Sequence, residues 1–317
     1  MKVFVTRQIP QIGLDMLEAH CEVTVNPHDR VLTPDELMEG VRNADGLLCL
    51  LTDEITSRVM DANPNLKVIS NYAVGFNNID VSAATERGIP VTNTPGVLTD
   101  ATADLAWALI MAVSRRIVEG DTYTREGRFV GWGPMLLLGS GVAGKTLGIV
   151  GMGRIGQAVA RRATGFDMRI LYHDIEPVAS VEESYNARFV GLEELLQESD
   201  FVTLHAPLTD ETRHMIGERE LGLMRKTAYL INTARGPLVD EKALVEALKD
   251  GVIAGAGLDV YEDEPWLAPG LAKLPNAVLL PHLGSATLET RSKMAEMAAG
   301  NVLAALQGET PPNLVNL

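Results

Sequence analysis

Three residues of this chain have side chains that together suit proton transfer beside a bound carboxylate. Arg235, Glu264 and His282 each come soon after a predicted strand. An arginine binds a carboxylate through two parallel hydrogen bonds, a histidine exchanges protons near neutral pH, and an adjacent acid stabilises the imidazolium. An open parallel sheet binds ligands at the carboxyl ends of its strands, so these three side chains can share one ligand site. Together they provide what hydride transfer to a 2-oxo acid needs. Taken singly, the three also have simpler interpretations: a surface arginine, a loop acid and a histidine with ordinary partners.

A glycine-rich turn after the apolar run Thr146–Val150 predicts where a nucleotide binds. Gly151, Gly153 and Gly156 give the pattern G-x-G-x-x-G, and Asp174 stands after the next apolar run. The glycines permit a tight turn and a close approach to a pyrophosphate, and the helix that follows presents free N–H groups to it. Such a turn alone also occurs in ordinary strand–helix units, but here strand, turn, helix and acid are in register.

Asp174 also bears on which dinucleotide binds. At the end of the second strand its carboxylate accepts hydrogen bonds from ribose hydroxyls. The next residues are Ile175, Glu176 and Pro177, none of them basic. A 2′-phosphate would therefore face two carboxylates with no arginine to pair with, which is unfavourable, so we expect NAD(H) rather than NADP(H). Arg154, inside the turn, is either a pyrophosphate contact or an exposed side chain.

These residues need elements to position them, and a chain of 317 residues suits two domains. The first part of the chain alternates between short apolar runs and amphipathic stretches, as expected of a doubly wound parallel α/β domain. Its strands are predicted at Lys2–Thr6, Glu22–Val25, Gly46–Leu50, Lys67–Ser70 and Pro90–Thr92, and its helices include Ile12–His20 and Thr33–Ala44. In the nucleotide unit we predict strands at Thr146–Val150, Arg169–His173, Phe201–His205, Ala228–Asn232, Gly255–Val260 and Ala277–Leu280, with helices at Leu192–Glu198 and Glu241–Lys249.

Three further segments complete the expected organisation. One helical pattern runs from Asp100 to about Gly127, and an apolar, glycine-rich segment at 128–144 follows it. We expect this segment to be an arm that packs against the chain itself or a second subunit. The last predicted helix, Leu288–Leu306, has no strand after it and should return to the first domain, and the tail Gly308–Leu317 should be irregular.

Composition excludes several classes of function. The net charge of −15 argues against non-specific nucleic-acid binding, and the apolar runs are far shorter than a membrane span. The start, Met1–Val5, goes straight into a strand and has no signal-peptide layout. We find no metal-ligand spacing and expect no metal. Cys21 and Cys49 are expected to be buried thiols in a reducing compartment, which predicts a cytoplasmic protein.

Several motifs give the chain a resemblance to the D-isomer-specific 2-hydroxyacid dehydrogenases over essentially its whole length. The matching residues are Tyr72–Asp80, Gly151–Gly156, His205–Pro207, Asn232–Gly236, Gly257–Val260, Glu264-Pro265 and Pro281–Thr287. Within that family the chain is most similar to the glyoxylate/hydroxypyruvate reductases, through Gly131–Met135, Gly139 and Gly284–Thr287. Together these motifs are highly specific.

The resemblance implies a fold, a reaction and an assembly. The fold is an NAD-binding Rossmann domain, residues 99–285, inserted into a flavodoxin-like substrate domain, residues 1–98 and 286–317. The reaction is the reversible, NADH-dependent reduction of glyoxylate or hydroxypyruvate to the D-2-hydroxy acid. The substrate is expected in the cleft between the domains, which would close about crossings near Pro95–Thr99 and Gly284–Leu288. The assembly is a homodimer formed through an arm near residues 100–144.

The resemblance also implies roles for individual residues. Arg235 would bind the substrate carboxylate and carbonyl, His282 would donate the proton in reduction, and Glu264 would hydrogen-bond His282. Asp259 would contact the nicotinamide amide. The implied substrate-binding residues are Leu51, Val74 and Gly75 (both through backbone N–H groups), Arg235, Ser285 and Trp132, the last either reaching the partner's site or only anchoring the interface. The implied cofactor-binding residues are Gly151, Gly153, Arg154, Ile155, Gly156, Asp174, His205, Ala206, Pro207, Thr212, Thr233, Ala234, Arg235, Asp259, His282 and Gly284.

Other activities of similar proteins stay open at this point. Pyruvate reduction, as in D-lactate dehydrogenases, is the main alternative, because a methyl and a hydroxymethyl group make similar demands on a pocket. Phosphoglycerate oxidation is disfavoured because Leu50-Leu51-Thr52 lacks the arginine those enzymes carry, and phosphite oxidation because Val74 replaces their lysine. An NAD(H)-sensing, peptide-binding corepressor is the most distant alternative, and the chain has no long disordered extension typical of one.

Overall fold

A computed structural model describes residues 1–316, which divide into two compact units. Unit 1 is Met1–Leu98 with the chain from Ser285 onward, and unit 2 is Thr99–Gly284. The division falls one residue before the predicted boundary at 285/286. The reason is local: Gly284 is bonded within unit 2, through Thr102, whereas the carbonyl of Ser285 accepts bonds from the start of the last helix.

Unit 1 is built on a five-stranded parallel sheet with the order β2-β1-β3-β4-β5. Its strands are β1 (Lys2–Val5), β2 (Glu22–Val25), β3 (Gly46–Cys49), β4 (Val68–Asn71) and β5 (Val91–Thr92). Its helices are α1 (Gln11–Glu18), α2 (Pro34–Val41), α3 (Ser57–Asp61), α4 (Val81–Glu86) and α12 (Leu288–Leu306). The predicted flavodoxin-like fold is confirmed, since this strand order is that of the doubly wound flavodoxin type.

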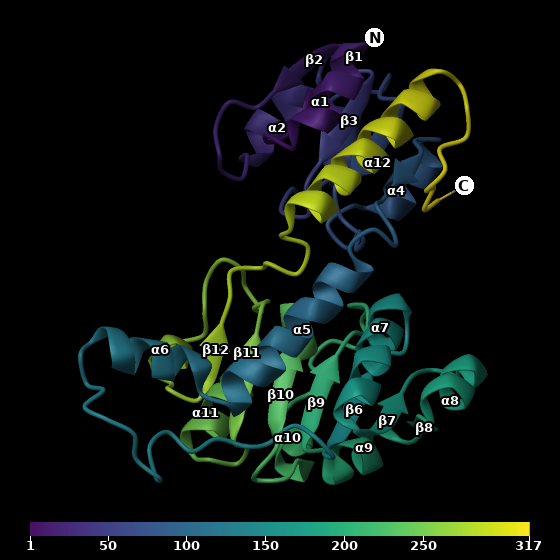
Figure 1. The fold of residues 1–317 in the computed structure, drawn as a ribbon. Coiled ribbons are helices and arrows are strands. Elements are labelled where there is room, and N and C mark those ends of the chain that lie inside the picture. The colour runs from purple at the N-terminus through teal and green to yellow at the C-terminus, as the bar shows by residue number, and fades with distance from the viewer. Residues whose placement is uncertain (317) are drawn as a thin grey trace. The chain divides into compact units, whose positions relative to one another are not determined.

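Two separate cores cover the two faces of this sheet. Apolar residues of α1 and α12 pack together on one face, and those of α2, α3 and α4 pack on the other. In Figure 1 the long C-terminal helix α12, drawn in yellow, lies beside α1 although the two are at opposite ends of the chain. The last helix therefore packs on the sheet of unit 1, as the absence of a strand after it predicted.

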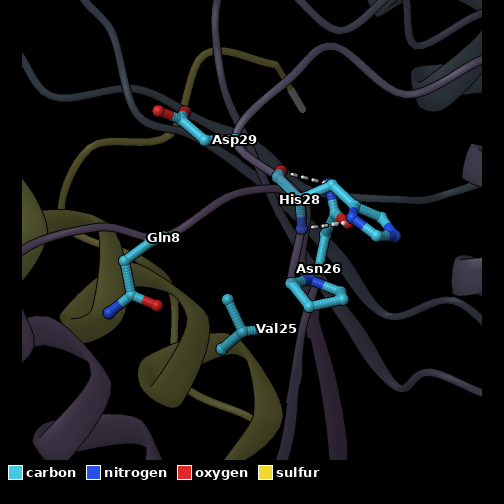
Figure 2. A pocket seen from close by; sticks show the side chains of 6 residues that line it. Gln8, Val25, Asn26, His28 and Asp29 are labelled. Carbon is cyan, nitrogen blue, oxygen red and sulfur yellow. Dashed lines mark hydrogen bonds between the residues drawn. The ribbon is translucent and has the colours of Figure 1, made fainter.

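A pocket of about 270 Å³ lies in unit 1 beyond the carboxyl ends of β1 and β2 (Figure 2). It is lined by Gln8, Val25, Asn26, Pro27, His28 and Asp29. The Asn26 side chain is already engaged, because it donates to the Thr6 and His28 carbonyls and accepts from the His28 N–H. None of the residues predicted to bind substrate or cofactor lines this pocket.

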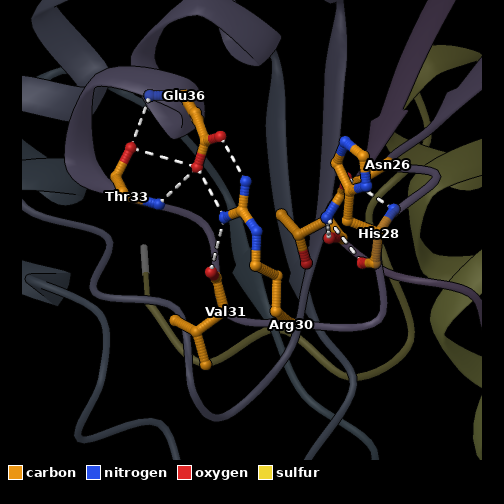
Figure 3. A network of polar contacts seen from close by, with 7 residues as sticks. Asn26, His28, Arg30, Val31, Thr33 and Glu36 are labelled. Atoms are coloured by element: carbon orange, nitrogen blue, oxygen red, sulfur yellow. Dashed lines mark hydrogen bonds and ion pairs between the residues drawn. The ribbon is translucent and has the colours of Figure 1, made fainter.

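The start of α2 shows how sequence signals set an element in unit 1. Thr33 precedes the helix, its hydroxyl accepts the Glu36 N–H at 3.3 Å, and the Glu36 carboxylate accepts the Thr33 N–H at 2.9 Å. Arg30 pairs with the same carboxylate (Figure 3). The hydrogen bond from Arg30, followed by that from the Thr33 backbone, lowers the pKa of Glu36 to about 2. This reciprocal capping fixes where the helix begins.

Unit 2 is built on a seven-stranded parallel sheet with the order β12-β11-β10-β9-β6-β7-β8. Its strands are β6 (Thr146–Val150), β7 (Arg169–His173), β8 (Arg188–Phe189), β9 (Phe201–Leu204), β10 (Tyr229–Asn232), β11 (Gly255–Leu258) and β12 (Ala277–Leu279). Its helices are α5 (Thr99–Ser114), α6 (Ile117–Arg125), α7 (Arg154–Ala163), α8 (Ala179–Tyr185), α9 (Leu192–Glu198), α10 (Glu218–Leu223) and α11 (Glu241–Lys249), with single 3₁₀ turns at Thr164–Phe166, Gly236–Leu238 and Leu271–Lys273.

The order of these strands confirms the predicted Rossmann fold. From β6 the chain adds β7 and β8 on one side, and it then returns to add β9 to β12 on the other side. The boundary between β6 and β9 is therefore the topological switch point, where such sheets bind dinucleotides. Helices α5, α7 and α8 cover one face, and α9, α10 and α11 cover the other. The strands are buried on both faces, which explains why they read as continuous apolar runs.

The single long helix predicted from Asp100 to about Gly127 is wrong. The structure has two helices, because α5 stops at Ser114 and Arg116 takes a left-handed conformation, φ +55°. In a continuous helix the Ser114 carbonyl would accept the N–H four residues on; instead it accepts the N–H of Ser140, at 2.8 Å. The returning chain thus ends the helix.

The segment that could form an arm is therefore shorter than the predicted span near 100–144. It is the chain between α5 and β6, residues 115–145, which we call the arm. Helix α5 is part of the core of unit 2, with Ala106 and Ile110 fully buried. The exposed apolar side chains begin only after α5, and the chain between α6 and β6 contains no helix or strand (Figure 1).

Across residues 1–316, no helix is both long and apolar enough to cross a membrane.

Candidate active site

The glycine turn between β6 and α7 has the shape that a pyrophosphate requires. Gly151 has φ +92°, and a Cβ at this position would lie 2.6 Å from the backbone nitrogen of Ala206. A Cβ at Gly156 would lie 2.1 Å from the Gly151 carbonyl oxygen, so α7 can approach the turn only through glycine. Gly153 precedes α7, and no side chain caps the helix there. The first N–H groups of α7, at Arg154 and Ile155, therefore remain available to an anion.

Asp174 lies where the sequence predicted, directly after β7. One carboxylate oxygen accepts the N–H of Met152, in the glycine turn, at 2.6 Å, and the other accepts the N–H of Ile175 at 2.7 Å. A carboxylate has further acceptor capacity beyond these two bonds. Asp174 is thus held beside the turn with lone pairs left for ribose hydroxyls.

Unpartnered buried atoms at the next strand ends also fit a bound dinucleotide. His205 follows β9, and its Nε2 shares a hydrogen bond of 2.9 Å with the Thr203 hydroxyl. Within residues 1–316, its Nδ1 and the Thr233 hydroxyl after β10 are buried without a partner. Burial lowers the pKa of His205 to about 3, so the imidazole is neutral. Buried polar groups are normally satisfied, and these orphans lie at the edge where a Rossmann sheet binds its cofactor.

Four more predicted cofactor residues lie on the loops of His205 and Thr233. Ala206 and Pro207 continue from His205, and Thr212 closes that loop by donating to the Pro207 carbonyl at 2.8 Å. Ala234 follows Thr233, and its N–H donates to the Asn232 side chain. The residues present therefore fit a nicotinamide dinucleotide.

Glu264 and His282 form the pair that the sequence predicted. His282 Nδ1 lies 2.9 Å from Glu264 Oε2, and the two side chains are 26% and 30% exposed. The other Glu264 oxygen accepts the Tyr261 N–H at 3.1 Å. Partial burial works to raise the pKa of Glu264, but the bond to His282, the Tyr261 N–H and the charge of Arg235 outweigh it and lower the pKa. Glu264 is therefore ionised near neutral pH and orients the imidazole.

Arg235 is close enough to Glu264 for their charges to interact. It follows β10, and one of its terminal nitrogens donates to the Ala234 carbonyl at 2.7 Å. Burial lowers the pKa of Arg235, against the effect of Glu264, but a guanidinium stays charged. The next residue must be glycine, because a Cβ at Gly236 would lie 1.8 Å from the Tyr261 carbonyl oxygen. This contact joins the loop of Arg235 to the segment that leads to Glu264.

Asp259 has a structural task that the sequence reasoning missed. It is fully buried, and its two oxygens accept the N–H groups of Leu283 and Gly284 at 2.6 and 2.8 Å. Its carbonyl accepts the His282 N–H at 2.9 Å. His282 itself has φ +57°, a conformation that favours glycine. Asp259 therefore holds the backbone that carries the histidine.

The predicted substrate residues of unit 1 lie in two loops that side chains hold in place. Asn71 donates to the Gly75 carbonyl, and Asn93 donates to the Val74 carbonyl, both at 2.8 Å. Within the described part of the chain, the N–H groups of Val74 and Gly75 have no partner. Two consecutive free N–H groups suit an anion. Leu51 lies in the loop after β3, next to the Leu50 N–H that donates to buried Asp53.

The last two predicted substrate residues lie outside these groups. Ser285 begins the segment that leads to α12. Trp132 is in the arm and is 85% exposed, so it packs on little within the described chain.

Comparison with known proteins places the chain in a family. The family model for the D-isomer specific 2-hydroxyacid dehydrogenase NAD binding domain matches residues 107–284. A glyoxylate reductase of Thermococcus gammatolerans is 54% identical over 99% of this chain and 96% of its own length. A solved structure from Thermus thermophilus has a TM-score of 0.93 and 51% identity, covering 99% of this chain and 100% of that one. An NADPH-dependent glyoxylate/hydroxypyruvate reductase of Sinorhizobium meliloti, solved with NADP and malonate, has a TM-score of 0.88 and 34% identity, covering 99% and 96%.

The fold, the glycine turn and these matches define the class of protein. The chain belongs to the D-isomer specific 2-hydroxyacid dehydrogenases. It is therefore an oxidoreductase that uses a nicotinamide dinucleotide, and unit 2 contains the matched cofactor-binding domain.

Proposed function

We propose that this dehydrogenase reduces glyoxylate or hydroxypyruvate with NADH, and oxidises the corresponding 2-hydroxy acid in reverse, with D stereochemistry where the product is chiral. The observation that carries the proposal is the 2.9 Å bond between His282 and Glu264, with the charge of Arg235 beside it. A proton donor, a carboxylate that orients it and a cation that binds carboxylates are what reduction of a 2-oxo acid needs. The curated relatives at this level of identity include glyoxylate reductases.

In this proposal His282 is the proton donor. Because its Nδ1 is bound to Glu264, Nε2 is the ring nitrogen that holds the proton for the substrate oxygen. Arg235 binds the substrate carboxylate and polarises the carbonyl. When bound, the nicotinamide ring supplies the hydride that reduces the carbonyl carbon. For unit 1 we propose that the free N–H groups of Val74 and Gly75 bind an anion such as a carboxylate, and that Leu51 and Ser285 are further substrate contacts.

We also propose that NADH is preferred over NADPH. The turn Gly151–Gly156 would hold the pyrophosphate, and Asp174 would accept ribose hydroxyls. Asp174 and the exposed Glu176 would both face a 2′-phosphate, and there is no basic residue among residues 174–177. Like charges without a counterion disfavour such a contact. NADPH dependence is a property of the Sinorhizobium relative. The test for this chain is to measure kcat/KM with each cofactor: we expect a higher value with NADH, and equal values would contradict the proposal.

We also propose how the protein assembles and where it is located. The arm exposes Val130 at 96% and Trp132 at 85%, and large exposed apolar patches mark interaction sites. We propose a second copy of the chain as its partner, with Trp132 contributing to that interface. Both cysteines are free thiols; Cys49 is buried as predicted, whereas Cys21 is only partly buried. Free thiols are consistent with a cytoplasmic location.

The decisive experiment is an initial-rate assay of NADH oxidation with glyoxylate, hydroxypyruvate and pyruvate on the purified protein. We expect kcat/KM for glyoxylate or hydroxypyruvate to exceed that for pyruvate. The His282→Ala variant in the same assay controls for contaminating reductases. A higher kcat/KM for pyruvate would replace the proposal with a lactate-type reaction, and no turnover of any of the three would overturn it.

A further inference from the structure

Glu241 is a buried carboxylate to which neither the motif analysis nor the proposed reaction gives a task. It is the first residue of α11 and is 5% exposed. Within residues 1–316 it forms no ion pair with a lysine, arginine or histidine. Instead, its Oε2 accepts the Glu262 N–H at 2.8 Å and its Oε1 accepts the Ala268 N–H at 2.7 Å. A buried charge is tolerated only when hydrogen bonds compensate it. These two hydrogen bonds are therefore what allows the carboxylate of Glu241 to be buried.

The contact is reciprocal at one end. The Glu262 carboxylate accepts the Glu241 N–H at 3.2 Å, which caps the start of α11. Its other oxygen lies 2.7 Å from His214 Nε2. The helix start and the backbone at Glu262 are thus joined by two hydrogen bonds running in opposite directions.

The two backbone groups bound by Glu241 bracket the loop that carries Glu264. We call residues 262–268 the glutamate loop. Residues 263–266 are all exposed, and Trp266 is 76% exposed. Burial of apolar side chains therefore does little to fix the middle of this loop. Within the loop, the Trp266 N–H donates to the Asp263 carbonyl at 2.9 Å, and Leu267 and Ala268 pack against the core of unit 2. At the two ends of the loop, the N–H groups of Glu262 and Ala268 are both bound by Glu241.

We propose that Glu241 is a positioning residue for the Glu264–His282 pair, acting by clamping both ends of the glutamate loop. The inference rests on the proposed function, because it assigns Glu264 the task of orienting the proton donor. With the clamp intact, Glu264 stays 2.9 Å from His282. Without it, the loop samples positions in which the imidazole lacks its carboxylate. The protonated form of His282 then loses stabilisation, and proton donation slows.

The test is Glu241→Gln, which keeps the size of the side chain but turns one oxygen into an NH₂ group. That group cannot accept from Glu262 or Ala268, so one end of the clamp is lost. Glu246→Gln is the matched control, because Glu246 is on the same helix but exposed. We expect kcat for 2-oxo acid reduction to fall about tenfold in Glu241→Gln, with an unchanged Kd for NADH. Reduction needs the protonated imidazole, so the alkaline limb of the kcat/KM profile should also move to lower pH.

A double-mutant cycle separates positioning from general destabilisation. In a Glu264→Gln background, adding Glu241→Gln should leave kcat nearly unchanged, because its effect runs through Glu264. Additive losses, or an unshifted pH profile in Glu241→Gln, would overturn the proposal. Should Glu241→Gln not fold, Glu241→Asp takes its place: it keeps the charge but is too short to reach both ends of the loop.

Amide exchange tests the clamp without any enzymatic turnover. Hydrogen–deuterium exchange should be about tenfold faster in Glu241→Gln at the one amide, of Glu262 or Ala268, that loses its acceptor, and unchanged at both in Glu246→Gln. If the wild type reduces no 2-oxo acid, the proposed function fails, and unchanged exchange would then reject the clamp as well. If the wild type is active but exchange is unchanged, the clamp alone is wrong.

Discussion

At the scale of single residues, His282 is held from two directions. Glu264 binds its ring through Nδ1, and Asp259 binds its backbone and that of the two residues after it. The left-handed backbone at His282 is unfavourable for a residue with a side chain. The buried Asp259 carboxylate compensates by satisfying the N–H groups that this conformation turns toward it. The imidazole is therefore held in one orientation rather than free on a loop.

His282→Ala should lower kcat by roughly 10²–10⁴-fold, the usual contribution of a positioned acid–base group. The Kd for NADH, measured by fluorescence titration, should stay within about twofold. His28→Ala is the control, since His28 is exposed in unit 1 and bonds only through its backbone. Near-normal turnover in His282→Ala would show that another group supplies the proton.

His205 makes a separate prediction about stability and pH. Its pKa is about 3 in the folded chain, against an ordinary value of 6.5. Protonation therefore favours the unfolded chain, and stability is lost as pH falls below 6.5 toward 3. Between pH 7 and pH 5 the free energy of unfolding should drop by about 2 kcal/mol more in the wild type than in His205→Gln. Urea unfolding at the two pH values measures this, and equal losses would contradict the neutral, buried state of His205.

Sequence reasoning at this scale found the side chains but not what holds them. Arg235, Glu264 and His282 were predicted because each follows a strand, and the structure contains the predicted Glu264–His282 bond. The task of Asp259 depends on the left-handed turn at His282, which no spacing of residue types reveals. Glu241 looks in sequence like an ordinary acid in the first turn of a helix. Only the path of the glutamate loop shows that its carboxylate is buried.

At the scale of elements, the sequence predicted most boundaries and failed where tertiary contacts decide. The strands β6 and β7 and the helices α9, α11 and α12 have the predicted bounds, because their apolar periods and caps are local signals. The helix predicted from Asp100 to Gly127 is interrupted, since the Ser140 N–H takes the Ser114 carbonyl. That partner comes from a segment with no periodicity of its own. The strand β8 was missed because it begins with an exposed arginine, Arg188, and does not form an apolar run.

The cap of α2 offers a matched test of an element's stability. Thr33→Ala removes the hydroxyl that accepts the Glu36 N–H and should lower the free energy of unfolding by about 1 kcal/mol. Thr56 is the control, because it also precedes a helix, α3, but its side chain makes no capping bond. Thr56→Ala should therefore have a clearly smaller effect in the same denaturant titration. Equal losses would mean that the hydroxyl of Thr33 contributes nothing as a cap.

At the scale of the whole molecule, the chain is a dehydrogenase whose cofactor domain is inserted into another α/β unit. The insertion explains why the glycine turn lies near the middle of the sequence rather than near its start. Several exposed apolar side chains in the arm after α5 have no packing partner that would explain them within a single chain. They are Phe129, Val130, Trp132, Met135 and Leu138, which we call the apolar surface of the arm.

The proposed partner for this surface, a second copy of the chain, gives the last prediction. The wild type should have about twice the 34.2 kDa mass of one chain in light scattering after gel filtration. Val130→Asp with Met135→Asp places two charges in the arm, which a buried apolar interface does not tolerate, and should yield the monomer mass. Val31→Asp is the control, because Val31 is an exposed apolar residue of unit 1. A monomeric wild type would contradict the homodimer. If the arm variant becomes monomeric yet keeps its kcat/KM for glyoxylate, Trp132 anchors the interface and contributes nothing to a partner's active site.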